Sequence, residues 1–471
     1  MGRAFFVLVL SFLLGIVLFS PRGLAGDQLN AWNWFHYWLN ARYFSELGYG
    51  DLYDQALLAQ GETDGPMGQV KRRRSLETYR IEDVVRNPPV RSSAWSDPRW
   101  EQFKLDLQSL EGQDDRWNQI LLDRGFNGTP VWVSIVHAFD RIVDLRGPPG
   151  RWLGRALDPL LVLALALLLF HAVGPTRAAA ALGIFMLLPT TMGRFPGSLL
   201  QYDVFVLVMA SFCLLSLGRR GWAGVALGLA TALRLFPAVF VAALLARAAV
   251  DAWDGRAERS WLRFSGGVAL GLALAVGIGA LGPRGPGAWA EFLDNTSLHQ
   301  EHHVLGDGRV GLEHLFSVEL GADEVPRHRV RRQTLDENRR LFRASQAGLF
   351  LLLLLAARRR DVQDTFVLAC VAFFLATVAS RYYWTVLALF PLLGLGRKDK
   401  RLLVWGSLVA LLPLAAHGLA AMQGAHKLFR WLAVERALLC GLVATCLLFV
   451  ALDLRRWGLR GWLLRGFPEE P

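Results

Sequence analysis

Apolar residues are gathered along the chain into runs, many of them long enough to cross a bilayer, with polar segments between them. A transmembrane helix needs about 20 mainly apolar residues. We therefore predict membrane spans at residues 5–20, 153–174, 178–192, 199–217, 222–249, 265–282, 346–357, 363–380, 382–396, 402–421 and 435–453. The pattern predicts an all-α polytopic membrane protein.

The first run follows a single arginine, Arg3, and ends before the sequence GLAG at residues 23–26, which is similar to a signal-peptide cleavage site. We expect this run to remain as an uncleaved first span, because it is long for the apolar part of a signal peptide. A cleaved signal peptide is the alternative.

Basic residues cluster in the short connections and the tail, at residues 218–222, 246–263, 357–361, 396–400 and 453–465. Short loops rich in Lys and Arg stay on the cytoplasmic side, and all five clusters share that side only if residues 222–249 cross twice. Pro237 breaks this run, and Arg234 is costly to expose to lipid, so we predict a hairpin of two short helices. The chain then has about 12 spans with both termini cytoplasmic, and about 11 spans is the alternative.

This topology places two long polar segments on the exoplasmic side. They are residues 21–152, a large first loop expected to contain amphipathic helices, and residues 283–345. Long loops are largely exempt from the charge rule, so the basic sequence KRRR at 71–74 does not argue against the assignment. We interpret the chain as a single membrane domain with its chemistry on this face.

The distribution of charges and cysteines argues against a nucleic-acid-binding protein and against a protein built on disulfides or cysteine metal sites. The formal net charge is +11, which in a soluble protein would suggest binding to nucleic acid. In a membrane protein the basic connections explain the charge, so no nucleic-acid partner is expected. All four cysteines lie in apolar runs, which predicts neither a disulfide framework nor a cysteine metal site.

The segment after the first span is unusually rich in aromatic and amide residues. Between residues 30 and 47 there is no Pro or Gly. Helical spacing places apolar side chains on one face and polar ones on another, the polar set being Asn33, His36, Tyr37 and Asn40. We predict an amphipathic helix lying on the membrane surface, and a simple aromatic anchor at the interface is the alternative.

Three short elements carry a resemblance to a known group. They are Tyr37, Ala41, Gly48 and Leu52–Asp54 in the first loop, then Gln201–Asp203, and then Arg234, Phe236 and Pro237. In this order they resemble GT-C-type integral membrane glycosyltransferases, particularly the bacterial, mannosyltransferase-like ones that use polyprenyl-phosphate sugars. The resemblance implies a polyprenyl-phosphate-sugar donor, a glycan or lipid acceptor, and an active exoplasmic face on the inner membrane.

The resemblance also implies a carboxylate base in the first loop. Several relatives have an acidic residue four positions before the first Tyr, where this chain has Asn33. An amide cannot take a proton from an acceptor hydroxyl. We therefore favour Asp27, the carboxylate nearest the first span, as the catalytic base, with Asp54 and Asp51 as alternatives.

Departure of a lipid phosphate needs cations or hydrogen-bond donors near the ends of the spans. The candidates are Arg234, Arg194 and Arg381, for which snorkelling at helix ends is the alternative, and His302 and His303 of the second loop. The histidines there, with His299 and His314, fix no metal-binding geometry, and a solvated loop is the alternative. No cofactor is implied with certainty, although a divalent cation is possible.

The predicted cavity wall on the acceptor side consists of Asn33, His36, Tyr37, Asn40, Tyr53, Tyr202 and Asp203. Tyr382 and Tyr383 are interpreted as aromatic-belt residues. Residues 123–132 are interpreted as a turn that returns to a surface helix rather than as part of an acceptor site.

The sequence contains no P-loop or dinucleotide motif, and the cytoplasmic connections are short, which favours a lipid-linked donor over a soluble nucleotide sugar. We expect a membrane glycosyltransferase surrounded by membrane lipids. A transporter or flippase of a lipid-linked substrate is one alternative, although only one broken span is found where a transporter has a pair. A catalytically inactive scaffold of the same fold is the other.

Overall fold

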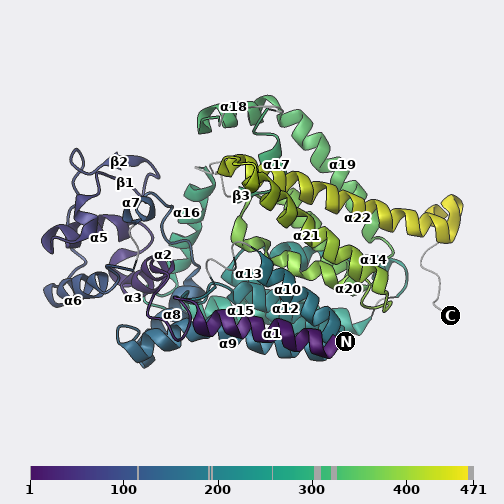
Figure 1. The fold of residues 1–471 in the computed structure, drawn as a ribbon, viewed down its shortest axis with the longest axis horizontal. Helices are drawn as coiled ribbons and strands as arrows, with labels where there is room; N and C mark the ends of the chain where they lie inside the picture. The colour runs from purple at the N-terminus through teal and green to yellow at the C-terminus, as the bar shows by residue number, and fades with distance from the viewer. Residues whose placement is uncertain are drawn as a thin grey trace.

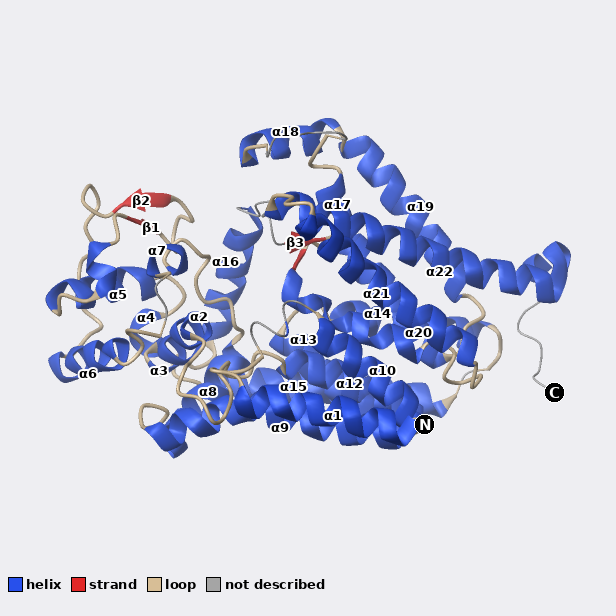
Figure 2. Ribbon diagram, viewed as in Figure 1, coloured by secondary structure: helices blue, strands red, loops and turns tan. Residues whose placement is uncertain are grey.

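The structure is a computed structural model that describes residues 2–113, 116–188, 191, 195–256, 258–301, 309–319 and 326–464. The described chain is mainly helical, and its strands are limited to two short antiparallel pairs (Figure 2). Long helices form a bundle, and shorter elements from the first loop form a separate lobe at one end of it (Figure 1). The predicted all-α polytopic class is confirmed.

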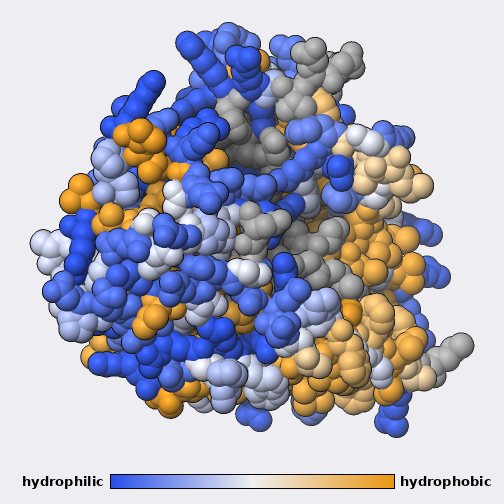
Figure 3. Space-filling view, turned by 60° about the vertical axis from the view of Figure 1, so that its left-hand side comes forward, coloured by the Kyte–Doolittle hydropathy of each residue, from blue (hydrophilic) through white to orange (hydrophobic). Residues whose placement is uncertain are grey.

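In the described part of the chain, six helices are long and apolar enough to cross a membrane: α1 (Gly2–Phe19), α9 (Pro148–Val173), α15 (Arg259–Ala280), α19 (Arg339–Ala357), α21 (Lys400–Met422) and α22 (Lys427–Leu464). Three apolar helices are shorter: α10 (Pro175–Leu187), α12 (Asp203–Ser216) and α20 (Val362–Ala376). Many of their large apolar side chains are exposed, as on α1 at Phe5, Leu8 and Phe12. Figure 3 shows such apolar surface gathered on one side of the molecule, as lipid contact requires.

The predicted span at 222–249 is two helices, α13 (Arg220–Leu233) and α14 (Ala238–Trp253). Between them Arg234 is extended, with φ −149° and ψ 134°, because the helix cannot continue into Pro237. The break therefore falls at the predicted residues. The span predicted at 382–396 is a 3₁₀ helix, η3 (Arg381–Leu392).

Close helix contact fixes the end of α13. Glycines Gly224 and Gly228 of α13 face Gly267 and Gly271 of α15, and a Cβ on any of the four would clash with backbone of the opposite helix. Small residues four apart let two helix backbones approach in this way. This contact holds the α13 terminus, and Arg234 with it, in a defined position.

The first-loop lobe consists of α2 (Ala31–Asn33), the π-helix η1 (Trp34–Leu39), α3 (Asn40–Arg42), α4 (Phe44–Leu47), α5 (Leu52–Glu62), η2 (Pro66–Gln69), β1 (Arg72–Arg74), β2 (Ile81–Asp83), α6 (Asp97–Gln108), α7 (Trp117–Ile120) and α8 (Pro130–Val143). Strands β1 and β2 pair with Arg73 opposite Glu82.

The predicted amphipathic helix exists as the consecutive segments α2, η1, α3 and α4. The prediction that it lies on the membrane surface is wrong, because Trp34, Phe35 and Trp38 are buried inside the protein. Phe35 packs edge-on against Trp117 of α7, with ring centroids 5.6 Å apart. The aromatic face therefore forms the core of the lobe, where burial removes more apolar area from water than the interface would.

The second loop contributes α16 (Gly287–Glu301), β3 (Arg309–Val310), α17 (Leu312–Leu315) and α18 (His328–Glu337). Strand β3 pairs antiparallel with β4 (Ala379–Ser380), with Arg309 opposite Ser380, and so lies beside the start of η3. The start of α1 and the end of α22 lie at the end of the bundle away from the lobe (Figure 1).

Candidate functional site

Arg234, at the break between α13 and α14, reaches the lobe. Its Nη2 donates a hydrogen bond to the hydroxyl of Tyr37, 3.1 Å away, and its guanidinium carbon lies 5.4 Å from the centre of the Tyr37 ring. Arg234 also interacts electrostatically with Asp203, at the start of α12, and with Tyr382 and Tyr383, at the start of η3. The break thus brings a half-buried cation to the junction of bundle and lobe.

Tyr37 forms the lobe side of this junction. Its hydroxyl donates to Oδ1 of Asn127 at 3.3 Å, and its ring packs against Trp132 at 4.8 Å and Phe126 at 5.4 Å between centroids. Burial raises the pKa of the Tyr37 phenol, while the nearby Arg234 acts in the opposite direction. Tyr37 is therefore a neutral donor and acceptor at physiological pH.

The Asp123 carboxylate lies beside Tyr37. Its Oδ2 accepts a hydrogen bond from Nε1 of Trp32 at 2.8 Å. It interacts electrostatically with Tyr37 and with two cations, Arg124 and Arg309. Asp123 is therefore a carboxylate that is hydrogen-bonded to an indole and electrostatically coupled to two cations.

Arg124 is an unsatisfied cation. Burial lowers the pKa of its guanidinium to about 10, with further lowering by Arg309 and Arg74, and Asp123 opposes the shift. Its Nη1 atom is buried and has no hydrogen-bond partner. A buried donor without a partner costs free energy, and a bound anion would remove that cost.

Arg309 closes the group from the side of the second loop. Burial lowers the pKa of its guanidinium, and Tyr382, Asp123 and Tyr383 oppose the shift. Tyr382 and Tyr383 interact electrostatically with Arg234 as well as with Arg309. We call Tyr37, Asp123, Arg124, Arg234 and Arg309 the junction cluster.

The turn that carries Asp123 is held by His36 and Tyr53. Nδ1 of His36 lies 2.8 Å from the carbonyl oxygen of Trp32, so Nδ1 carries the proton. Burial lowers the pKa of His36, which leaves Nε2 as an acceptor for the Tyr53 hydroxyl at 2.7 Å. That hydroxyl accepts from the backbone N–H of Gly125 at 3.0 Å. His36 is thus a neutral positioning group in this structure.

The second loop meets the lobe at Tyr79 as well. The Tyr79 hydroxyl lies 3.1 Å from Nδ1 of His299 on α16. It donates a hydrogen bond to the carbonyl oxygen of Arg124 at 3.4 Å. Tyr79 has a positive φ of 58°, which is unusual for a large side chain. This contact holds α16 against the turn of the junction cluster.

The remaining residues of the predicted acceptor wall hold the fold around the cluster. Asn33 accepts from the backbone N–H of Leu199 at 2.7 Å and donates to Gln201 at 3.0 Å. Asn40 donates to the carbonyl of Gly48 at 3.3 Å. Tyr202 is buried against Phe185 and Phe195.

The three predicted catalytic carboxylates lie with other cations. Asp27 is exposed and interacts electrostatically with Arg155. Asp54 pairs with Arg73, which also contacts Glu82 at 3.3 Å. Burial and the nearby Glu77 raise the pKa of Asp51, and Arg284 opposes them.

Of the predicted phosphate-binding residues, Arg234 lies in the junction cluster. The guanidinium of Arg381 lies 5.7 Å from the ring centre of Trp431. Arg194, His302 and His303 lie outside the described residues. Within the described ranges, no group of three or more His, Cys, Asp or Glu side chains could hold a metal ion.

Sequence reasoning missed Asp123, Arg124 and Arg309 as functional candidates. The first two fall in the stretch interpreted as a return turn, and Arg309 falls in a loop considered for its histidines. The available signal was the acid–arginine pair directly before Gly125, a position where a turn can present both side chains. Tyr382 and Tyr383, interpreted as belt residues, also border the cluster.

Comparisons with known proteins bear on the half of the chain that contains Asp203, Arg234 and Arg309. A family model, that of glycosyltransferase family 87, matches residues 145–381, which is half of the chain. No curated protein and no solved structure matches the sequence. The first-loop residues of the junction cluster lie outside the matched region. The chain belongs to glycosyltransferase family 87, a GT-C-like family of membrane glycosyltransferases, as the sequence resemblance implied.

Proposed function

We propose that this membrane glycosyltransferase transfers a sugar from a polyprenyl-phosphate donor to a glycan or lipid acceptor at the exoplasmic face of a bacterial inner membrane. The observation that carries the proposal is the hydrogen bond from Arg234 of the bundle to Tyr37 of the lobe, with Asp123, Arg124 and Arg309 around it. A lipid-linked donor has its phosphate at such a boundary, since its chain lies in the bilayer.

The cations suit the charge that the reaction develops. In a polyprenyl-phosphate sugar the phosphate is a diester with one negative charge, and the departing polyprenyl phosphate gains a second when the C1–O bond breaks. Donors placed where charge develops lower the barrier. Arg124, with its buried and unpartnered Nη1, and Arg234 and Arg309 are the proposed phosphate ligands.

Asp123 is the proposed base. The acceptor hydroxyl transfers its proton to Asp123 while its oxygen forms a bond to C1 of the sugar, and the C1–O bond electrons pass to the phosphate. A carboxylate base needs to be ionised and within reach of the acceptor hydroxyl. The Trp32 hydrogen bond fixes one carboxylate oxygen at 2.8 Å and leaves the other for the proton.

The orientation of the protein in the membrane follows from the positions of its termini and of the lobe. The start of α1 and the end of α22 lie at the far end of the bundle from the lobe (Figure 1). If the basic connections face the cytoplasm, both termini are cytoplasmic and the junction cluster is exoplasmic. Asp203, at the start of α12, is the carboxylate that then attracts Arg234 electrostatically.

The test is transfer in proteoliposomes that contain the purified protein, labelled polyprenyl-phosphate hexoses and a panel of glycan and lipid acceptors. We expect release of polyprenyl phosphate and a labelled product, with turnover reduced about 10²- to 10⁴-fold in Asp123→Asn. Asp27→Asn serves as the paired variant, because Asp27 is the base favoured by sequence alone. Loss of transfer in Asp27→Asn with wild-type turnover in Asp123→Asn would assign the base to Asp27, and no donor consumption by the wild type would reject a lipid-linked donor.

A further inference from the structure

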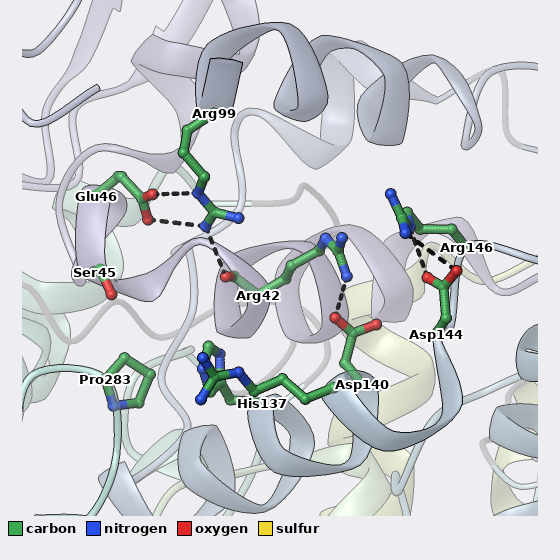
Figure 4. Close-up of a pocket in the computed structure, with 10 residues that line it drawn as sticks. Arg42, Ser45, Glu46, Arg99, His137, Asp140, Asp144, Arg146 and Pro283 are labelled. Carbon is green, nitrogen blue, oxygen red and sulfur yellow. Dashed lines mark hydrogen bonds and ion pairs between the residues drawn. The ribbon is translucent and has the colours of Figure 1, made fainter. Parts of the chain in front are cut away.

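A polar cavity in the lobe is lined by residues from α3, α4 and α8 and from the segments around them. Its volume is about 630 Å³, and it is lined by Arg42, Ser45, Glu46, Arg99, His137, Asp140, Arg141, Asp144, Arg146 and Pro283. Figure 4 shows Glu46 and Arg99 at one side, Arg42 and Asp140 in the middle, and Asp144 and Arg146 at the other side. None of its lining residues belongs to the junction cluster.

The carboxylates of this cavity already have partners. Glu46 accepts from Nε of Arg99 at 2.7 Å, Asp144 accepts from Nε of Arg146 at 2.6 Å, and Asp140 pairs with Arg42. Behind Arg42, the buried Asp106 accepts from Tyr43 at 2.7 Å and from Gln102 at 3.1 Å, and it interacts with Arg151. The acidic groups are therefore satisfied within the protein.

One cation that lines the cavity, Arg141, is not neutralised by a carboxylate of the described residues. Arg141 is exposed and has no ion-pair or hydrogen-bond partner in the described part of the chain. Burial, Arg141 and Arg99 lower the pKa of His137, so this imidazole adds no charge at neutral pH, although Asp140 and the Ala41 backbone oppose the shift. No Trp, Tyr or Phe is among the described residues that line the cavity, so the large aromatic platforms on which sugar faces stack are absent from this lining. The lining matches a small anion better than a neutral glycan.

The cavity lies where lipid headgroups would be. Arg146 directly precedes α9, and Pro283 follows the end of α15, both of which are candidate membrane spans. Large apolar side chains next to these positions are exposed: Ile142 by 83%, Leu281 by 88% and Trp152 by 47%. Exposed apolar residues beside unpaired arginine are typical of an interface with the bilayer.

We propose that this cavity binds the headgroup phosphate of an anionic membrane lipid, with Arg141 as the principal ligand and Arg146 at its edge. The bound lipid holds α8 and the lobe against the ends of α9 and α15. The site is separate from the proposed donor site, so it stands whether or not the donor is a polyprenyl-phosphate sugar.

The experiment uses the full-length protein in detergent, with native mass spectrometry and thermal unfolding as readouts. Dioleoyl phosphatidylglycerol is compared with dioleoyl phosphatidylcholine and with inorganic phosphate. We expect selective retention of phosphatidylglycerol and a rise in Tm, and about tenfold weaker retention in Arg141→Ala and in Arg141→Ala/Arg146→Ala. Arg86→Ala is the matched control, since it removes an exposed arginine elsewhere in the lobe.

Equal retention by the wild type, the control and both cavity variants would reject the site. Equal retention of phosphatidylcholine would reject the need for an anionic headgroup. Displacement of the lipid by millimolar inorganic phosphate, with the same gain in Tm, would assign the cavity to free phosphate and overturn the lipid proposal. Arg141 makes no contact that folding depends on, so unchanged Tm of the lipid-free variants confirms that they are folded.

Discussion

The guanidinium of Arg234 and the phenol of Tyr37 lie 3.1 Å apart although 197 positions separate them in the chain. One residue comes from a break between two helices of the bundle, and the other comes from the first π-helix of the lobe. The contact joins the part of the chain that matches the transferase family to the part that does not. Tests of the proposed function therefore start with this pair.

Replacing Arg234 should impair the chemical step far more than replacing its partner. Arg234→Ala removes a half-buried cation from the phosphate side, and we expect a loss of about 10²- to 10³-fold in kcat. Tyr37→Phe removes the hydroxyl's hydrogen bonds to Arg234 and Asn127, each worth about 0.5–1 kcal/mol, and should cost only about 5- to 30-fold. Steady-state transfer in proteoliposomes measures both. Similar small effects for the two variants would mean that Arg234 holds the lobe and does not act on the donor.

Arg124 should lower the stability of the folded protein and support sugar transfer. Its guanidinium is buried near Arg309 and Arg74, which lowers its pKa, so the charged form is disfavoured in the folded protein without donor. We expect Arg124→Gln to raise Tm slightly and to reduce transfer at least about tenfold. Arg80→Gln, an exposed position in the same lobe, should change neither. A fall in Tm without a loss of transfer would show a structural role.

The neutral state of His36 should make stability depend on pH. Burial lowers the pKa of His36 in the folded protein, whereas in the unfolded chain it is about 6.5. Below that pH the unfolded state binds more protons, so the free energy of unfolding decreases as the pH falls. We expect the Tm of the wild type to fall between about pH 7 and 5 by more than that of His36→Gln. Parallel curves for the two proteins would contradict the assignment.

The contact between α13 and α15 allows a test with neighbouring glycines. Gly267 faces the backbone of Gly221, whereas a Cβ on Gly266 meets nothing within 4 Å. Gly267→Ala should destabilise the protein by about 1–3 kcal/mol and lower transfer, because α13 carries Arg234 at its end. Gly266→Ala should be neutral or slightly stabilising, since Ala favours helix. Equal Tm values for the two variants would argue against close packing of these helices.

A buried ion cluster under the second loop should hold Arg309 in position. Glu435 of α22 lies 2.7 Å from Nδ1 of His314, whose Nε2 accepts from Arg331, and all three side chains are buried. Glu435 also interacts electrostatically with the backbone of Gly311, two residues after Arg309. Glu435→Ala removes the buried carboxylate that pairs with His314, with an expected loss of about 3–5 kcal/mol. Thermal unfolding measures the loss of stability, and the KM for the donor measures the effect on donor binding. Glu435→Gln should be less impaired than Glu435→Ala in both measurements.

Local pattern determined the class of the protein and the place where the apolar run 222–249 divides into two helices. Run length and the cost of placing charge in lipid depend on nearby residues, so the break at Arg234 and Pro237 could be predicted where it occurs. The polar first loop and the transferase resemblance could be recognised in the same way. All of these features are carried by residues close together along the chain.

Only the tertiary structure decided which charged groups meet. Asp123, Arg234 and Arg309 come from a turn, a helix break and a strand far apart in sequence, and periodicity says nothing about contacts between such segments. The aromatic helix is a related case. The sequence shows that this helix has an apolar face and a polar face. Whether lipid or protein covers the apolar face depends on which segments pack against it, and here Trp117 and its neighbours in the lobe cover it.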